Sequence, residues 1–183
     1  MGTVWLAQDV AGRSVALKLV HPHLLTKPEF VRRFLREGEI GRRVTHPNVV
    51  RALQVGSATI DGRDAPWIAM EYVEGRTLRE LREDGPVAEA LLREIGRQVA
   101  SGLEAIHEAG VVHRDLKPEN VLITPDHLVK IMDLGVARLA DEVVRLSQSG
   151  TFAGSVHYAA PEQLRLAGRH VDGRADLHAL GLI

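Results

Sequence analysis

The stretch from Val111 to Ile123, VVHRDLKPENVLI, places a dense polar island between two apolar runs. The flanking Val-Val and Val-Leu-Ile have the character of buried strands, whereas His113 to Asn120 contain two cations, two carboxylates, a histidine and an amide. Burying charge costs free energy unless the charges are paired or put to use. The rest of the chain must therefore supply partners for this island, and that requirement limits how the chain can fold.

The composition is that of an ordinary globular protein. Of the 183 residues, 45% are apolar and 26% are charged, and the net charge is −1, which excludes a disordered or fibrous chain. This near-neutral balance offers no electrostatic footprint for nucleic acid, so we expect no nucleic-acid partner. The absence of cysteine excludes disulfides and thiolate metal sites and is compatible with a cytoplasmic setting.

Neither a membrane helix nor a signal peptide is visible in the sequence. No apolar run approaches the roughly 18–20 residues that a membrane span requires, and the start MGTVWLAQD lacks a basic and an apolar region. We therefore expect no membrane segment in this chain and a cytoplasmic location, with any anchor lying elsewhere in a longer protein.

The first half of the chain reads mainly as strands with one helix. Residues 3–9 and 14–20 predict a hairpin, and residues 48–57 and 66–73 predict two further strands separated by the turn-rich DGRDA. Thr26 and Glu29 form a capping-box pattern that predicts a helix start, with Pro28 in the first turn. One stripe of that helix carries Phe30, Phe34, Glu37, Gly41 and Val44, which places the carboxylate of Glu37 on the inward face.

The second half reads mainly as helix. Apolar residues recur at three and four from Val87 to Glu108, with Gly110 as the stop signal. Short strands follow at 121–123 and 128–132, and residues 133–162 predict a long functional loop. We therefore expect an α+β protein with two lobes, 1–74 and 75–183, that meet near Glu74 and Gly75.

Several polar residues form patterns that suit phosphate chemistry. Asp115 and Asn120 are five residues apart, and Asp133 follows at another strand end; such oxygen ligands suit Mg²⁺ when phosphates complete its shell. Lys18 lies within a predicted strand and Glu37 on the inward face of a helix. Each is difficult to explain alone, and together they predict an ion pair where the sheet meets the helix.

The motifs together resemble the eukaryotic-type serine/threonine protein kinases of bacteria over essentially the whole chain. Val15-Ala16-Leu17-Lys18 resembles the strand-lysine motif, His113 to Asn120 the catalytic loop, Asp133-Leu134-Gly135 the metal-binding triplet, and Ala160-Pro161-Glu162 the end of the activation segment. Asp176 resembles the aspartate that opens the central helix of the large lobe. The resemblance implies a two-lobed kinase fold that uses ATP and Mg²⁺.

The resemblance also implies roles for single residues. Lys18, held by Glu37, would bind the α- and β-phosphates; Asp115 would accept the proton of the substrate hydroxyl; Lys117 would neutralise the transferred phosphoryl group. Asn120 and Asp133 would bind Mg²⁺. A lysine two residues after the catalytic aspartate is the pattern of serine/threonine kinases, so protein substrates with Ser or Thr are expected.

Adenine would lie at the junction of the lobes by the same resemblance. The expected binding set is the backbone of Glu71 and Val73, the side chains of Val4, Ala16 and Leu122 around the ring, Met70 at the back pocket, and Gly2 as the last glycine of the glycine-rich loop.

Regulation and assembly are further expectations. Arg114 beside Asp115 predicts that an anion, such as a phosphate on Ser147, Ser149 or Thr151, orders the loop. Ser155 resembles the hydroxyl residue that supports the catalytic loop, and dimerisation would serve trans-autophosphorylation.

Both ends of the chain read as cut. The first glycine strand and the arginine that pairs with Glu162 are absent from the sequence, so we expect this chain alone to be unstable and poorly active, because Glu162 would be an unpaired buried carboxylate. Two alternatives stay open: a non-catalytic pseudokinase or fragment that acts as a binding module, and a small-molecule phosphotransferase, whose class lacks the Ala-Pro-Glu segment.

Overall fold

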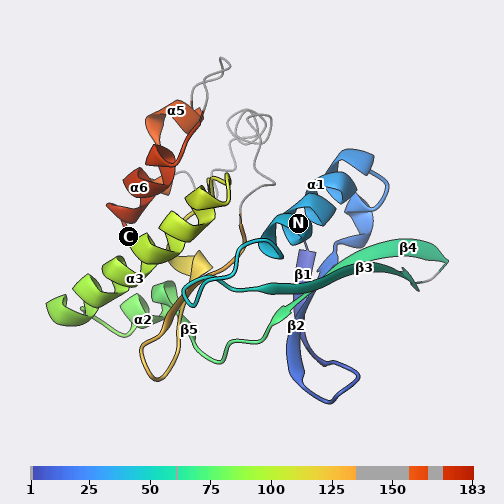
Figure 1. Ribbon diagram of the computed structural model, residues 1–183, viewed down its shortest axis with the longest axis horizontal. Helices are drawn as coiled ribbons and strands as arrows, with labels where there is room; N and C mark the ends of the chain where they lie inside the picture. Colours follow the sequence, from blue (N-terminus) through green and yellow to red (C-terminus); the bar gives the residue numbers. More distant parts are fainter. Residues whose placement is uncertain (1, 61, 135–156, 165–170) are drawn as a thin grey trace.

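The first part of the fold is an antiparallel sheet covered by one helix. The computed structural model describes residues 2–60, 62–134, 157–164 and 171–183. Four strands pair in the order β1-β2-β4-β3, with bounds Gly2–Gln8, Ser14–Val20, Arg63–Glu71 and Ala52–Ile60. Helix α1 (Pro28–Gly41) contacts β3 and β4, and Figure 1 shows it against one side of the sheet. A short 3-10 helix, η1 (Pro22–Leu24), precedes it.

The second part is mainly helical. A small sheet in the order β5-β6-β7, with bounds Arg76–Thr77, Val121–Ile123 and Val129–Ile131, lies beside the long helix α3 (Glu89–Glu108). The described residues of this part also form helices α2 (Leu78–Glu83), α5 (Pro161–Leu164) and α6 (Arg174–Leu180) and the 3-10 helix η2 (Pro118–Asn120). Figure 1 shows α6 next to α3, which it contacts. The predicted α+β class is therefore confirmed.

Helix α1 has the predicted inward stripe but not the predicted start. Phe34 and Glu37 are buried as expected. The helix is capped by Lys27 without a side-chain hydrogen bond, and the Thr26 hydroxyl donates to the His23 carbonyl at 3.5 Å, so the capping box proposed for Thr26 is wrong. Pro28, whose ring fixes φ and which needs no N–H partner in the first turn, sets this start.

A capping box is present at the start of α2. The Glu80 N–H donates to the Thr77 hydroxyl at 3.2 Å, and the Thr77 N–H donates to Glu80 Oε2 at 2.7 Å. The Thr-x-x-Glu spacing was visible in the sequence, yet the helix that it begins was missed.

The predicted strand 48–57 begins too early, because its first residues belong to the other part of the molecule. The Val50 N–H donates to the Ile131 carbonyl at 2.8 Å, and the Ile131 N–H donates to the Asn48 carbonyl at 2.8 Å. Residues 48–50 therefore run beside β7, and β3 begins only at Ala52. Likewise, β4 begins at Arg63, within the stretch predicted as a turn.

Within the part of the chain that the structure describes, two apolar clusters hold the fold together. The larger one joins α3 to β6 and β7 and contains the fully buried Val99, Leu103, Ile106, Val121 and Ile131. The smaller one lies between α1 and the four-stranded sheet and contains Val20, Leu24, Phe34, Ala52 and Ile68. Lys18 of β2 and Asp133, which follows β7, are in contact where these two parts meet.

Candidate active site

A buried lysine links the sheet, the helix α1 and the segment after β7. Lys18 Nζ lies 2.7 Å from Glu37 Oε1 and 2.7 Å from Asp133 Oδ1. The side chains of Lys18 and Glu37 are only 7% and 9% exposed, whereas that of Asp133 is 33% exposed. The predicted pair between Lys18 and Glu37 is therefore present, and a third residue, 115 positions away in the chain, joins it.

The charges of this cluster explain its pKa shifts. Burial alone would lower the pKa of Lys18, but attraction to Asp133 and Glu37 outweighs it and raises the pKa to about 12. Burial raises the pKa of Glu37. The attraction of Lys18 acts in the opposite direction, but the repulsion of Asp133 offsets part of that attraction. One cation is thus shared by two carboxylates, so the site carries an excess negative charge that a divalent cation would neutralise.

The loop that carries Asp115 is held by two buried side chains. His113 is fully buried; its Nε2 lies 3.1 Å from the Met132 carbonyl, and its Nδ1 accepts from the Asp115 N–H at 3.2 Å. Asp176, 1% exposed, accepts from the N–H groups of His113 at 2.8 Å and Arg114 at 2.7 Å. These contacts fix the backbone on both sides of Arg114, directly before Asp115.

Three polar side chains of the island lie close together. Lys117 Nζ is 3.5 Å from Asp115 Oδ2, and Asn120 Nδ2 donates to the Asp115 carbonyl at 2.8 Å. The Met132 N–H donates to the Asn120 carbonyl at 2.9 Å, so Asn120 lies beside the residue that precedes Asp133. The structure thus connects Asp115, Lys117 and Asn120 to Asp133, and through Asp133 to Lys18.

The residues predicted to surround adenine lie on or just after strands of both sheets, and those on β1, β2 and β4 lie on paired strands. Ala16 of β2 pairs with Met70 of β4, and Val4 of β1 pairs with Lys18. Gly2 lies at the start of β1, where an added Cβ would be 2.2 Å from the Leu19 carbonyl oxygen. Glu71 is the last residue of β4, and Val73 follows that strand by two residues. Leu122 lies on β6.

The comparisons with known proteins agree with this geometry. The family model for the protein kinase domain matches residues 1–183. This chain belongs to the protein kinase family. Similar curated proteins include a probable serine/threonine-protein kinase of Corynebacterium efficiens, 38% identical, and the serine/threonine-protein kinase PknB of Mycobacterium leprae, 36% identical. Each alignment covers 100% of this chain but only 28% and 29% of the relative.

Membership of the family confirms the two-lobed, kinase-like fold expected from the motifs. The family implies the use of ATP and of protein substrates. The kinase domain spans less than a third of the length of the relatives it matches. No described helix combines the length and the apolar character that crossing a lipid bilayer requires.

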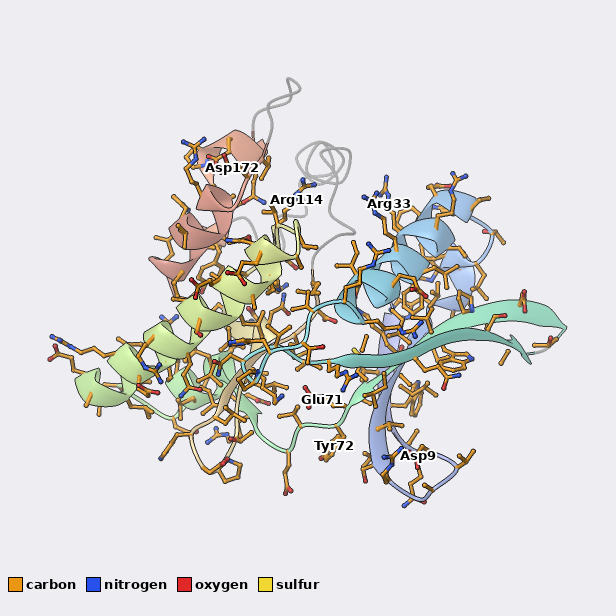
Figure 2. All side chains as sticks on the ribbon, in the orientation of Figure 1. Asp9, Arg33, Glu71, Tyr72, Arg114 and Asp172 are labelled. Carbon is orange, nitrogen blue, oxygen red and sulfur yellow. The ribbon has the colours of Figure 1, made fainter. Side chains whose placement is uncertain are left out.

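Two polar residues of the kinase domain were missed from the sequence. Lys130, in the apolar run of β7, donates to Glu71 Oε1 at 2.7 Å, and the Arg51 N–H donates to the same oxygen at 2.9 Å. Figure 2 shows Glu71 near the junction of the two parts. A lysine within a short apolar strand is the signal that identified Lys18 and could have identified Lys130. Gln163, which contacts the Arg114 carbonyl, gave no such signal.

Ser147, Ser149 and Thr151, the predicted phosphorylation sites, lie outside the described part of the chain. So does Ser155, which was predicted to support the catalytic loop. Within the described residues, Arg114 Nε is buried and has no hydrogen-bond partner, and the expectation that an anion pairs with Arg114 stays a prediction. The expectation that Glu162 is a buried carboxylate is wrong, because Glu162 is half-buried and Arg174 lies close enough to feel its charge.

Proposed function

We propose that the protein containing this domain transfers the γ-phosphate of ATP to Ser or Thr side chains of proteins. The observation that carries the proposal is the position of Lys18, whose ammonium group lies 2.7 Å from both Glu37 and Asp133. Two carboxylates keep this lysine protonated, and a protonated lysine at the junction of the lobes is suited to bind phosphate oxygens. The names of the similar proteins and the catalytic-loop motif support Ser and Thr as acceptors.

We assign the remaining roles residue by residue. Lys18, positioned by Glu37, binds the α- and β-phosphates. The backbone of Glu71 and Val73 binds adenine, with Met70 at the back pocket. The other members of the nucleotide site are Gly2, Val4, Ala16 and Leu122. The pairing of β1 with β2 and of β2 with β4 supports this assignment for the residues on those strands.

The donor set next to Lys18 fits Mg²⁺. The amide NH₂ of Asn120 is engaged by the Asp115 carbonyl, which leaves the amide oxygen for a cation, and Asp133 contributes a carboxylate. Within the described residues, no group of three or more acidic or histidine side chains forms a cluster that could hold a metal. Asn120 and Asp133 would therefore share the ion with phosphate oxygens, as Mg²⁺ prefers. When bound, the ion neutralises phosphate charge.

The transfer step needs a base, a cation and an aligned hydroxyl. The substrate oxygen attacks the γ-phosphorus while the bond from that phosphorus to the bridging oxygen breaks, and ADP leaves. Asp115 accepts the hydroxyl proton and orients the oxygen. Lys117, 3.5 Å from Asp115, neutralises charge on the transferred phosphoryl group.

The assignment extends to domain division and partners. We place the lobe boundary at 74/75, between the end of β4 and the start of β5. Because the proposed reaction consumes ATP, we infer a cytoplasmic location for the domain. We also infer transient dimers for trans-autophosphorylation, on the resemblance to regulated kinases alone.

The proposal is tested by phosphate transfer from radiolabelled ATP to a generic basic protein. We expect labelling of Ser or Thr that is lost in Asp115→Asn and retained in Asp126→Asn, because Asp126 lies in an exposed turn. A panel of aminoglycosides and choline is included as alternative acceptors. No transfer by the parent protein indicates a pseudokinase, and transfer to a small molecule alone indicates the other class; either result overturns the proposal.

A further inference from the structure

The residue directly before the proposed base has an unusual backbone conformation. Arg114 has φ of +65°, in the left-handed region that residues with a Cβ seldom adopt. Such a conformation persists only where surrounding contacts hold it. Asp176 Oδ1 accepts from the Arg114 N–H at 2.7 Å, which holds the peptide group on the N-terminal side.

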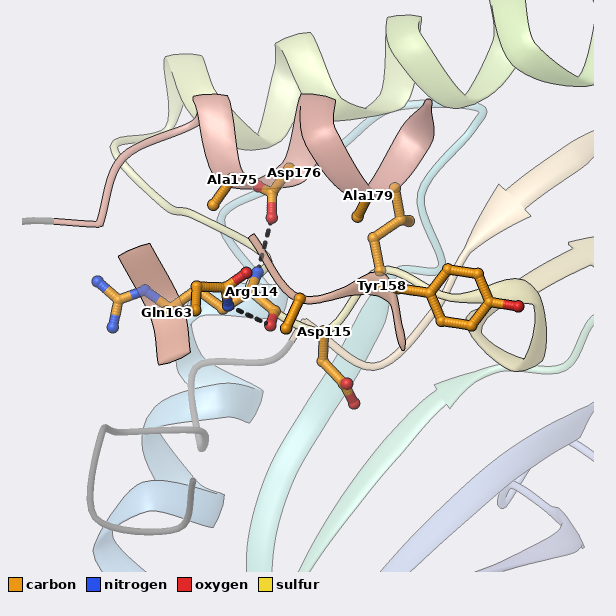
Figure 3. A pocket seen from close by; sticks show the side chains of 9 residues that line it. Arg114, Asp115, Tyr158, Gln163, Ala175, Asp176 and Ala179 are labelled. Atoms are coloured by element: carbon orange, nitrogen blue, oxygen red, sulfur yellow. Dashed lines mark hydrogen bonds between the residues drawn. The ribbon is translucent and has the colours of Figure 1, made fainter. Parts of the chain in front are cut away.

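Gln163 holds the peptide group on the other side. Its Nε2 donates to the Arg114 carbonyl at 2.8 Å, as the dashed lines in Figure 3 show. The N–H of the same peptide group belongs to Asp115 and donates to His113 Nδ1 at 3.2 Å. Both polar atoms of the peptide between Arg114 and Asp115 are therefore bound by side chains, and the orientation of that peptide sets where the Asp115 side chain begins.

The orientation of the Gln163 amide is itself determined. Its Oε1 accepts from the Ala160 N–H at 3.0 Å, within the turn that begins α5. Because a backbone N–H can only donate, the amide oxygen must face Ala160 and the NH₂ must face the Arg114 carbonyl. Gln163 thus joins two parts of the chain that are 49 positions apart.

The contact is a packed one and not a binding site for a ligand. The cavity between Gln163, Arg114, Asp115, Tyr158 and α6 measures about 10 Å³, which is about the room for one water molecule. Figure 3 shows Gln163 on one side of the catalytic loop and Asp176 on the other.

We propose that Gln163 is a positioning residue for phosphate transfer: by holding the Arg114 carbonyl, it keeps Asp115 oriented toward the acceptor hydroxyl. The inference rests on the proposed function, because Asp115 is the proposed base. Without the bond, the peptide between Arg114 and Asp115 is held only through the Asp115 N–H, so it rotates more readily and Arg114 can leave its left-handed conformation. Binding of ATP depends on other residues and is unaffected.

The test is the variant Gln163→Glu in the full protein. It keeps the side-chain size and the acceptor for Ala160, but a carboxylate oxygen replaces the donor and faces the Arg114 carbonyl. We expect kcat to fall about tenfold, equivalent to about 1.4 kcal/mol, with KM for ATP unchanged. Lowering the pH from about 8 to about 5.5 should raise the ratio of kcat in Gln163→Glu to kcat in the parent, because the facing Arg114 carbonyl favours the protonated carboxyl, which can donate.

The same substitution at an exposed position, Gln54→Glu, is the matched control. At every pH its kcat should equal that of the parent protein. Gln163→Met cannot donate at any pH, so its kcat should be lower than that of the parent and should not recover when the pH is lowered. The inference is overturned if Gln163→Glu has the parent kcat. It is equally overturned if the loss of kcat is independent of pH and accompanies a lowered melting temperature, as a merely structural role predicts.

Hydrogen exchange gives a readout that does not need activity. The amides of His113 to Leu116 should exchange faster in Gln163→Glu and Gln163→Met than in the parent protein and in Gln54→Glu. Unchanged exchange would show that Gln163 does not hold the loop. If the parent transfers no phosphate but exchange changes as expected, the proposed function fails while the structural part of the inference stands.

Discussion

The close approach of α1 to the sheet predicts that a single methyl group will disturb the Lys18 cluster. A Cβ added to Gly38 would lie 2.5 Å from Val55 Cγ2 and 2.9 Å from Ile68 Cγ1. Ile68 is 2% exposed and Val55 is branched at Cβ, so neither can move away freely. Gly38→Ala should therefore push α1 outward, together with the neighbouring Glu37.

The size of the effect follows from two opposing contributions. Alanine favours a helix interior over glycine by about 1 kcal/mol, whereas overpacking of a core costs about 1–3 kcal/mol. We expect Gly38→Ala to change the free energy of unfolding by about 0–2 kcal/mol in the destabilising direction. Gly96 in α3 provides the matched control, because an added Cβ there meets nothing within 4 Å. Gly96→Ala should stabilise by about 1 kcal/mol.

Equilibrium unfolding in urea measures both variants. The difference between them removes helix propensity and leaves the cost of overpacking, about 1–3 kcal/mol. The KM for ATP should rise in Gly38→Ala only, because Glu37 then holds Lys18 less well. Equal stabilisation by both substitutions would refute the argument, because it would mean that the space between α1 and the sheet accepts a methyl group without a steric clash.

Three further predictions concern charged residues. Lys130→Met should destabilise the domain by about 2 kcal/mol, because Glu71 loses a charged hydrogen-bond partner; an unchanged urea midpoint would contradict this. Burial raises the pKa of Glu37, so the folded domain binds a proton at this carboxyl more tightly than the unfolded chain does. The contribution of Glu37 to stability therefore falls as the pH rises above 4.5, the ordinary pKa of this group. In Glu37→Gln this part of the pH dependence of the urea midpoint should vanish, and an identical slope in both proteins would show the reasoning to be wrong. ADP should raise the melting temperature more with Mg²⁺ than with a chelator, and Asp133→Asn should abolish that difference; a shift independent of Mg²⁺ would remove Asp133 from the metal site.

The polar island could be predicted because it is local. His113 to Asn120 are consecutive, and their charges are conspicuous between apolar runs. The Lys18–Glu37 contact could be predicted because each residue conflicts with its surroundings: a lysine within an apolar strand and a carboxylate on an inward helix face. The additional bond from Lys18 to Asp133 was not predicted, because spacing in the chain does not show which distant loop reaches the lysine.

Other parts could not be predicted, for physical reasons. The Val49–Val50 run has high strand propensity whichever strand it pairs with, so the sequence alone did not separate pairing with β7 from pairing with β4. Thr26 and Thr77 both precede a glutamate by three residues, and only Thr77 forms the box, because α1 begins after Lys27. Gln163 is an ordinary surface residue type, and its importance depends on a backbone angle at Arg114 that no sequence pattern indicates.

The attachment of residues 48–50 to β7 has a consequence for how α1 can move. Because Asn48 also bonds the Val129 carbonyl and Gln98 on α3, the connection that follows α1 is anchored to the helical part of the molecule. The C-terminal end of α1 is therefore close to a fixed point, while its N-terminal end follows only the η1 segment. Any displacement of Glu37 should be a swing of the helix about its C-terminal end, so that labels placed near Glu29 would travel farther than labels near Arg42.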